Sequence, residues 1–194
     1  DLDDPLAVSA FADLVKLMDD KIMPEYKVLS DTKATDLFMS EKAAMVYVGS
    51  WKASVLDSAS FAANIGLIPM PTRINGNCAL GGISYAMSAY SENKDAAWKL
   101  ISYLGGEESN RVQAEARIEI PAYIDVQDTY GPSFQSIDGS IFIDQSKSAV
   151  KYPIHRALAS TMQAISDNAS AIFSRTTTPE DGVARMAEEV QTII

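Results

Sequence analysis

A continuous apolar run, Ala43 to Val48, constrains the fold of this chain more than any other stretch of its sequence. The run is apolar apart from the hydroxyl of Tyr47, and we expect Tyr47 to be a core residue. A strand of this kind is typical of sheets that carry crossover helices on both faces. Gly49-Ser50 then predicts a turn, with Ser50 capping a short helix that carries Trp51.

Two further extended segments follow. Asn64 to Ile68 is predicted to be a strand that ends at the prolines 69 and 71, because proline has no N–H to donate to a ladder. Cys78 to Tyr90 is also predicted to be extended, with Gly81-Gly82 interrupting it. Asn75-Gly76 predicts a hairpin tip between these two segments.

The remaining segments favour helices. Asp4-Pro5 and Thr178-Pro179 are typical helix starts, and Gly105-Gly106 is a typical stop. Lys27 to Lys33 is expected to be a loop, Arg117 to Ala122 extended, and 125–150 loops with a helical turn or two. Helices are predicted near 4–20, 31–40, 91–104, 107–116, 154–172 and 178–194. The alternation of helices and strands indicates the α/β class.

Composition and charge exclude several classes of function. The net charge is -10, which disfavours nucleic acid and anionic membrane as partners. Cys78 is the single cysteine, so no intrachain disulfide can form, and His155 is the single histidine. No cluster of histidine and cysteine indicates a zinc site, and we expect no metal and no cofactor.

Five residues are candidates for ligand binding: Trp51, Gly81, Gly82, Tyr85 and Arg117. Gly81 and Gly82 would bring backbone groups close to a ligand or act as a hinge, with a β-bulge as the alternative. Residues 84 and 85 alternate across their strand, so only one can face a ligand, and we prefer Tyr85. Arg117 can donate paired hydrogen bonds to hydroxyls or a carboxylate, or can be an ordinary solvated arginine. The other tryptophan, Trp98, is expected to pack within the protein.

An enzyme and a structural or adhesive domain are the alternatives. Gly82-Ile83-Ser84-Tyr85-Ala86 is close to the nucleophile elbow of serine hydrolases, with His155 as the available base. However, Ala86 stands where that motif has glycine, and the extended run continues where a helix should follow the serine. Asp19-Asp20 and Glu188-Glu189 are adjacent in sequence on helices and cannot face each other across a substrate, so a glycosidase pair is unsupported.

Three motifs in this order resemble the extracellular solute-binding proteins of ATP-binding-cassette importers, in particular the maltose-binding-protein-like, sugar-binding group. They are Ala43 to Trp51, Ile65-Gly66-Leu67-Ile68-Pro69-Met70-Pro71, and Gly81-Gly82-Ile83-Ser84-Tyr85-Ala86-Met87-Ser88. Ser40-Glu41 departs from the family, which usually has a glycine near this turn. The resemblance implies a type II periplasmic-binding-protein-like fold, no catalysis, and an extracytoplasmic location, in a periplasm or on a lipid anchor.

The resemblance also implies a mechanism and a division of the chain. Two lobes close on a mono- or oligosaccharide, with Trp51 in the cleft as a plate for the sugar ring, and the solute passes to the transmembrane subunits of the permease. The chain resembles the C-terminal half of the family, with 1–80 and 128–194 in the C-terminal lobe. Segment 81–127 is expected to pack on an N-terminal lobe that this chain lacks, so residues 82–125 should expose an apolar face or be covered by another copy of the chain.

Overall fold

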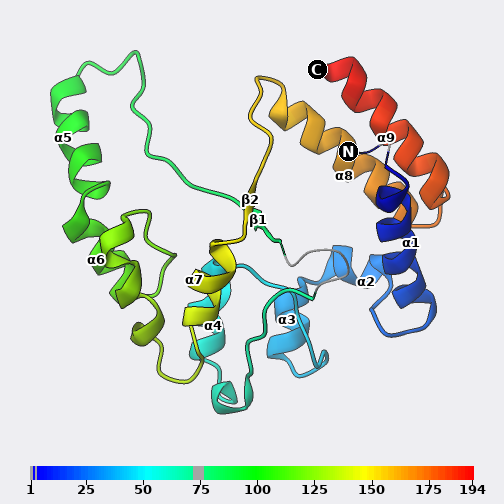
Figure 1. The fold of residues 1–194 in the computed structure, drawn as a ribbon, viewed down its shortest axis with the longest axis horizontal. Coiled ribbons are helices and arrows are strands. Elements are labelled where there is room, and N and C mark those ends of the chain that lie inside the picture. Colours follow the sequence, from blue (N-terminus) through cyan, green and yellow to red (C-terminus); the bar gives the residue numbers. More distant parts are fainter. Residues whose placement is uncertain (1, 3, 72–76) are drawn as a thin grey trace. The chain divides into compact units, whose positions relative to one another are not determined.

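The computed structural model describes residues 2, 4–71 and 77–194, so the predicted hairpin tip at Asn75-Gly76 lies outside the described residues. The chain forms two compact units (Figure 1). Unit 1 comprises residues 1–44 and 153–194, and unit 2 comprises residues 45–152.

Unit 1 is helical. Its longest helix, α8, packs along α9, and α1 contacts both of them (Figure 1). The starts of α1 and α9 were predicted correctly: Asp4 accepts a hydrogen bond from the N–H of Leu6 at 2.9 Å, and Thr178 accepts one from Asp181 at 3.1 Å. The helices are α1 (Pro5–Asp19), α2 (Tyr26–Asp31), α3 (Ala34–Met39), α8 (Leu158–Phe173) and α9 (Pro179–Ile193).

The core of unit 1 lies where α1, α8 and α9 meet. Its buried apolar side chains include those of Met18, Ile172, Val183 and Met186. Gly182 permits the close approach of α9 to α8, because a Cβ there would lie 2.4 Å from Cγ1 of Ile172. The buried face of α9 includes Val183 and Met186, and that of α8 includes Thr161, Ala164 and Asn168, whereas Met162 is exposed.

Unit 2 consists of helices and a small, exposed parallel sheet. Strand β1 (Ala79–Leu80) pairs with β2 (Val150–Lys151), with Ala79 opposite Val150. The core includes Leu56, Val126, Tyr130 and Ile137. The helical elements are η1 (Ser50–Lys52), α4 (Ala53–Asp57), η2 (Ala62–Asn64), α5 (Lys94–Leu104), α6 (Glu107–Glu115), η3 (Ile124–Thr129), η4 (Gly131–Ser133) and α7 (Ser140–Ser146), of which the η elements are 3-10 helices.

The predicted strands are largely absent from the described part of the chain. Ala43 to Val48 forms no ladder, and Tyr47 is 70% exposed instead of lying in the core. Asn64 to Ile68 forms no ladder either, and of Cys78 to Tyr90 only β1 is paired. The physical reason is that a strand needs hydrogen-bonding neighbours. In the described residues β1 and β2 pair with each other, and no further strand lies beside the apolar runs.

Other local predictions were also wrong. Most of Lys27 to Lys33 is helical, in α2, because the turn gains helical hydrogen bonds such as that from Thr32 N–H to the carbonyl of Val28. Ser50 lies inside η1, and Gly49 takes the capping position. Trp98 is 63% exposed on α5 rather than packed. Arg117 is not extended: its φ of 58° is left-handed and ends α6.

Candidate ligand-binding surface

Trp51 lies on a short, sharply turned segment of unit 2. It is the second residue of η1, which leads directly into α4. Its side chain is 66% exposed, so most of the indole is accessible to a ligand. A broad, rigid aromatic surface of this kind can cover the apolar face of a sugar ring.

Gly49 allows the Trp51 ring to lie close to the backbone of the turn. A Cβ at position 49 would lie 2.1 Å from Cζ3 of Trp51, which no real pair of atoms tolerates. Glycine allows this close approach and is not needed for an unusual φ, which is -93°. A side chain at position 49 would displace the indole from its place against the turn.

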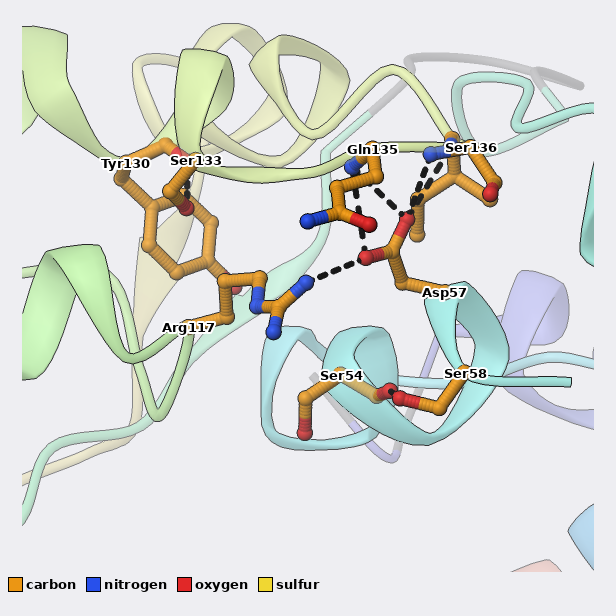
Figure 2. Close-up of polar contacts among 9 residues, drawn as sticks. Ser54, Asp57, Ser58, Arg117, Tyr130, Ser133, Gln135 and Ser136 are labelled. Carbon is orange, nitrogen blue, oxygen red and sulfur yellow. Dashed lines mark hydrogen bonds and ion pairs between the residues drawn. The ribbon is translucent and has the colours of Figure 1, made fainter.

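Asp57, the last residue of α4, is the centre of a buried polar cluster (Figure 2). Its carboxylate accepts backbone hydrogen bonds from three consecutive residues, at 3.1 Å from Gln135, 2.8 Å from Ser136 and 3.3 Å from Ile137. Nη1 of Arg117 donates to the other carboxylate oxygen at 2.6 Å. The side chain of Asp57 is only 1% exposed, so it joins three segments of unit 2 in its interior.

The environment of Asp57 determines its charge. Burial by itself raises the pKa of this carboxyl, but the N–H groups of Ser136, Ile137 and Gln135 and the Arg117 guanidinium together outweigh burial. The net result is a pKa below the ordinary value of an aspartate. Asp57 is therefore ionised at neutral pH, and its negative charge is matched inside the cluster.

Arg117 has an unusual backbone and an incompletely used side chain. A left-handed φ is uncommon for a residue with a long side chain. Its Nε is buried and has no hydrogen-bond partner within the described residues, while the side chain as a whole is 28% exposed. The structure thus gives the predicted ligand arginine an ion pair with Asp57, which sequence reasoning did not include.

Tyr130 supports the Trp51 turn from the interior of unit 2. It is fully buried, and its hydroxyl donates to the carbonyl oxygen of Ser50 at 3.3 Å. Its ring meets that of Phe134 edge to face, with centroids 5.0 Å apart. Burial, and to a smaller degree the charge of Glu119, raises the pKa of Tyr130, so the hydroxyl keeps its proton and remains a donor.

The other predicted residues, Gly81, Gly82 and Tyr85, follow β1 on an exposed, unpaired stretch. A Cβ at Gly81 would come no closer than 3.9 Å to Tyr152, and one at Gly82 would meet nothing within 4 Å. Neither has a positive φ, and β1 ends before them. Within the described structure neither glycine is therefore required by its own surroundings, and Tyr85 is 50% exposed.

The structure thus links two of the five predicted residues, Trp51 and Arg117, through α4 and Asp57. Sequence reasoning missed Asp57 and Tyr130. The signal for Asp57 was weak: an acid directly after the buried Leu56 in a short helix. Tyr130 gave no signal beyond its aromatic ring in a segment without a clear period.

The residues of the hydrolase alternative lie in different units. Ser84 is exposed in unit 2, and His155 is half-buried in unit 1. Among the described residues no three His, Cys, Asp or Glu side chains are grouped as metal ligands. In that same part of the chain, no helix is both long and apolar enough to cross a membrane.

Comparison with known proteins identifies the class of protein. A family profile described as bacterial extracellular solute-binding protein matches residues 1–137, which is more than half of the chain. The chain therefore belongs to the bacterial extracellular solute-binding protein family. This confirms the resemblance seen in the three sequence motifs.

Two relatives show what the chain is similar to. A galactooligosaccharide-binding protein of Bacillus subtilis (strain 168) is 32% identical over 89 residues, which cover 44% of this chain and 21% of the relative. The crystal structure of a sugar transporter from Rhizobium etli, in an open conformation, matches with a TM-score of 0.69 at 22% identity. That match covers 96% of this chain and 51% of the solved chain.

These comparisons confirm the fold class. The architecture is part of an α/β solute-binding fold, mostly helical and with a small sheet in the residues described. The chain spans about half the length of the solved relative. The match to the Bacillus protein spans about a fifth of that relative.

Proposed function

We propose that the protein containing this chain binds a mono- or oligosaccharide outside the cytoplasm and delivers it to the transmembrane subunits of an ATP-binding-cassette permease. Family membership supports solute binding, and both relatives are named for sugars. The observation that carries the choice of ligand is Trp51, a 66% exposed indole on a turn that is anchored below by buried residues. Pockets for small ligands combine such aromatic surfaces with a few placed polar groups.

In this proposal the chain supplies one wall of the binding site. Trp51 stacks on the sugar, Gly81, Gly82 and Tyr85 approach it from the stretch after β1, and Arg117 adds a donor beside the ion pair with Asp57. The opposite wall belongs to a second lobe, which closes over the ligand. No reaction is part of the mechanism, since binding and release suffice for delivery. The location is a periplasm or a lipid anchor on the outer face of the membrane.

Segment 81–127 has a separate role in the proposal: it packs on the second lobe. Its exposed apolar side chains support this role, because large exposed apolar patches mark interaction surfaces. They include Ile83 at 80%, Tyr90 at 95%, Trp98 at 63% and Ile124 at 78% exposed. In the isolated chain, a second copy takes the place of that lobe.

The ligand is tested by isothermal titration of the full-length protein with glucose, galactose, lactose, maltose and galactosyl-lactose. We expect Trp51→Ala to weaken binding of the sugar that binds by about tenfold or more, since an aromatic contact and its buried area are lost. Tyr47→Ala is the matched control, because Tyr47 is similarly exposed at 70% but belongs neither to the proposed site nor to segment 81–127. Unchanged affinity in Trp51→Ala, or the same loss in both variants, would contradict the proposal.

A further inference from the structure

The Trp51 turn is attached to the interior of unit 2 at both of its ends. Before it, the carbonyl of Ser50 accepts the hydrogen bond of the buried Tyr130. After it, α4 ends in Asp57. The carboxylate of Asp57 accepts hydrogen bonds from four donors, which are the backbone N–H groups of residues 135–137 and the Arg117 guanidinium. The indole itself is mostly in solvent, so its direction depends on the backbone that carries it.

Helix α4 is too short to hold this geometry alone. It contains 5 residues, and an isolated helix of that length is unstable because nucleation costs more than its few hydrogen bonds return. Its burial of Ala53 and Leu56 fixes one face, but packing by two apolar side chains still permits sliding. The directional contacts are those of Asp57 at its end.

From this geometry we propose that Asp57 is a positioning residue for the ligand surface: it acts through α4 to hold the Trp51 indole in its binding orientation. This inference rests on the proposed function and deepens it. Asp57 is 1% exposed and does not itself touch the ligand. Asp57 thereby lowers the entropic cost of binding, because an indole that is already ordered in the free protein does not have to be ordered when the sugar binds.

Arg117 is the second component of this arrangement. It comes from the end of α6 and reaches Asp57 across 60 positions of sequence. Its left-handed φ of 58° ends α6, as the left-handed residues Lys21, Glu41 and Arg175 end α1, α3 and α8, and its side chain reaches Asp57 from that turn. The ion pair therefore connects the α6 end to the Trp51 turn.

The mobility of Trp51 is the direct test. Trp98→Phe leaves Trp51 as the sole tryptophan of the 194-residue chain, which has 2 in all. Time-resolved fluorescence anisotropy in this background should show a larger fast depolarisation in Asp57→Asn than in the unsubstituted Asp57 chain. Asp144→Asn is the control, because Asp144 forms an exposed ion pair with Lys147 at 2.6 Å. An unchanged anisotropy decay in a folded Asp57→Asn chain would overturn the inference.

Arg117 variants keep the test valid if Asp57→Asn does not fold. Arg117→Met removes one of the four donors, whereas Arg117→Lys keeps the positive charge. We expect increased Trp51 mobility in Arg117→Met and partial restoration in Arg117→Lys. Equal decays in the two variants and the parent would also overturn the inference.

A double-mutant cycle on sugar affinity separates positioning from general stability. In the full-length protein, Asp57→Asn should weaken binding of the sugar that binds best in the panel by about fivefold. In the Trp51→Ala background the same change should have no further effect. A persistent loss in that background would show that Asp57 does not act through Trp51. If Trp51→Ala alone leaves affinity unchanged, the proposed function fails, while the anisotropy still decides whether Asp57 orders the turn.

Discussion

The guanidinium of Arg117 contacts the carboxylate of Asp57 at 2.6 Å. The Arg117 side chain is 28% exposed, whereas that of Asp57 is 1% exposed. The carboxylate is therefore shielded from water, while the arginine still reaches the surface. Removing Arg117 would leave a buried carboxylate without its cation, and removing the carboxylate would leave the guanidinium and the backbone donors without their anionic acceptor, so either change costs more than losing an exposed pair.

Replacement of Asp57 by asparagine should consequently destabilise unit 2. The change removes the charge that faces Arg117, and we expect the free energy of unfolding to fall by about 3 kcal/mol. Urea unfolding followed by tryptophan fluorescence measures this directly. Asp144→Asn, which breaks the exposed pair with Lys147, should change stability by less than about 0.5 kcal/mol. Comparable losses in the two variants would show that the buried pair contributes no more to stability than the exposed pair.

Stability should also depend on pH through Asp57. Its pKa is lowered in the folded state, so the unfolded chain binds its proton more readily. The stabilisation is fully present above the unfolded pKa of about 3.9 and is lost as pH falls through the lower folded pKa. Below about pH 4, therefore, the parent should lose stability more steeply than Asp57→Asn. Parallel pH profiles of the two proteins would contradict the assignment.

The parts of the fold that depend on local sequence signals could be predicted, and the parts that depend on contacts between distant segments mostly could not. Asp4-Pro5 and Thr178-Pro179 predicted their helices correctly, because a cap acts within one turn. The apolar run after Ala43 looked like a buried strand, but strand pairing depends on segments far away in the sequence. The partnership of Asp57 and Arg117 had no local signal, so the prediction of Arg117 as a ligand residue did not include its ion pair.

The contact between α8 and α9 gives a prediction for unit 1. Gly182→Ala places a Cβ 2.4 Å from Cγ1 and 2.6 Å from Cδ1 of Ile172, which is itself fully buried. Overpacking of this kind costs about 1–3 kcal/mol, and the better helix propensity of alanine offsets about 1 kcal/mol. We expect a net loss of about 1 kcal/mol, measured by thermal unfolding with far-ultraviolet circular dichroism.

Gly66→Ala is the matched control for this substitution. A Cβ at Gly66 meets nothing within 4 Å, so no destabilisation is expected there. A Gly182→Ala chain as stable as the parent would mean that α9 can move away from Ile172 at no cost.

The exposed apolar side chains of segment 81–127 predict self-association of the isolated chain. Size-exclusion chromatography with light scattering should give a mass that rises above 21.0 kDa with concentration. Leu100→Glu on α5, where Leu100 is 58% exposed, should shift the chain toward the monomer by placing a charge in the contact. Met45→Glu, at a residue 78% exposed outside the segment, should not. A chain that stays monomeric at all concentrations would argue against this surface.

The positions of Trp51 and Trp98 have a practical consequence for any unfolding experiment. Both tryptophans belong to unit 2, so tryptophan emission reports that unit, whereas far-ultraviolet circular dichroism reports the helices of both units. A transition in circular dichroism without a matching change in tryptophan emission therefore belongs to unit 1, so the two signals together resolve the two units within one unmodified chain. If the transitions coincide, the units melt as one cooperative block, and if they separate, the interval between them measures how weakly the units are coupled.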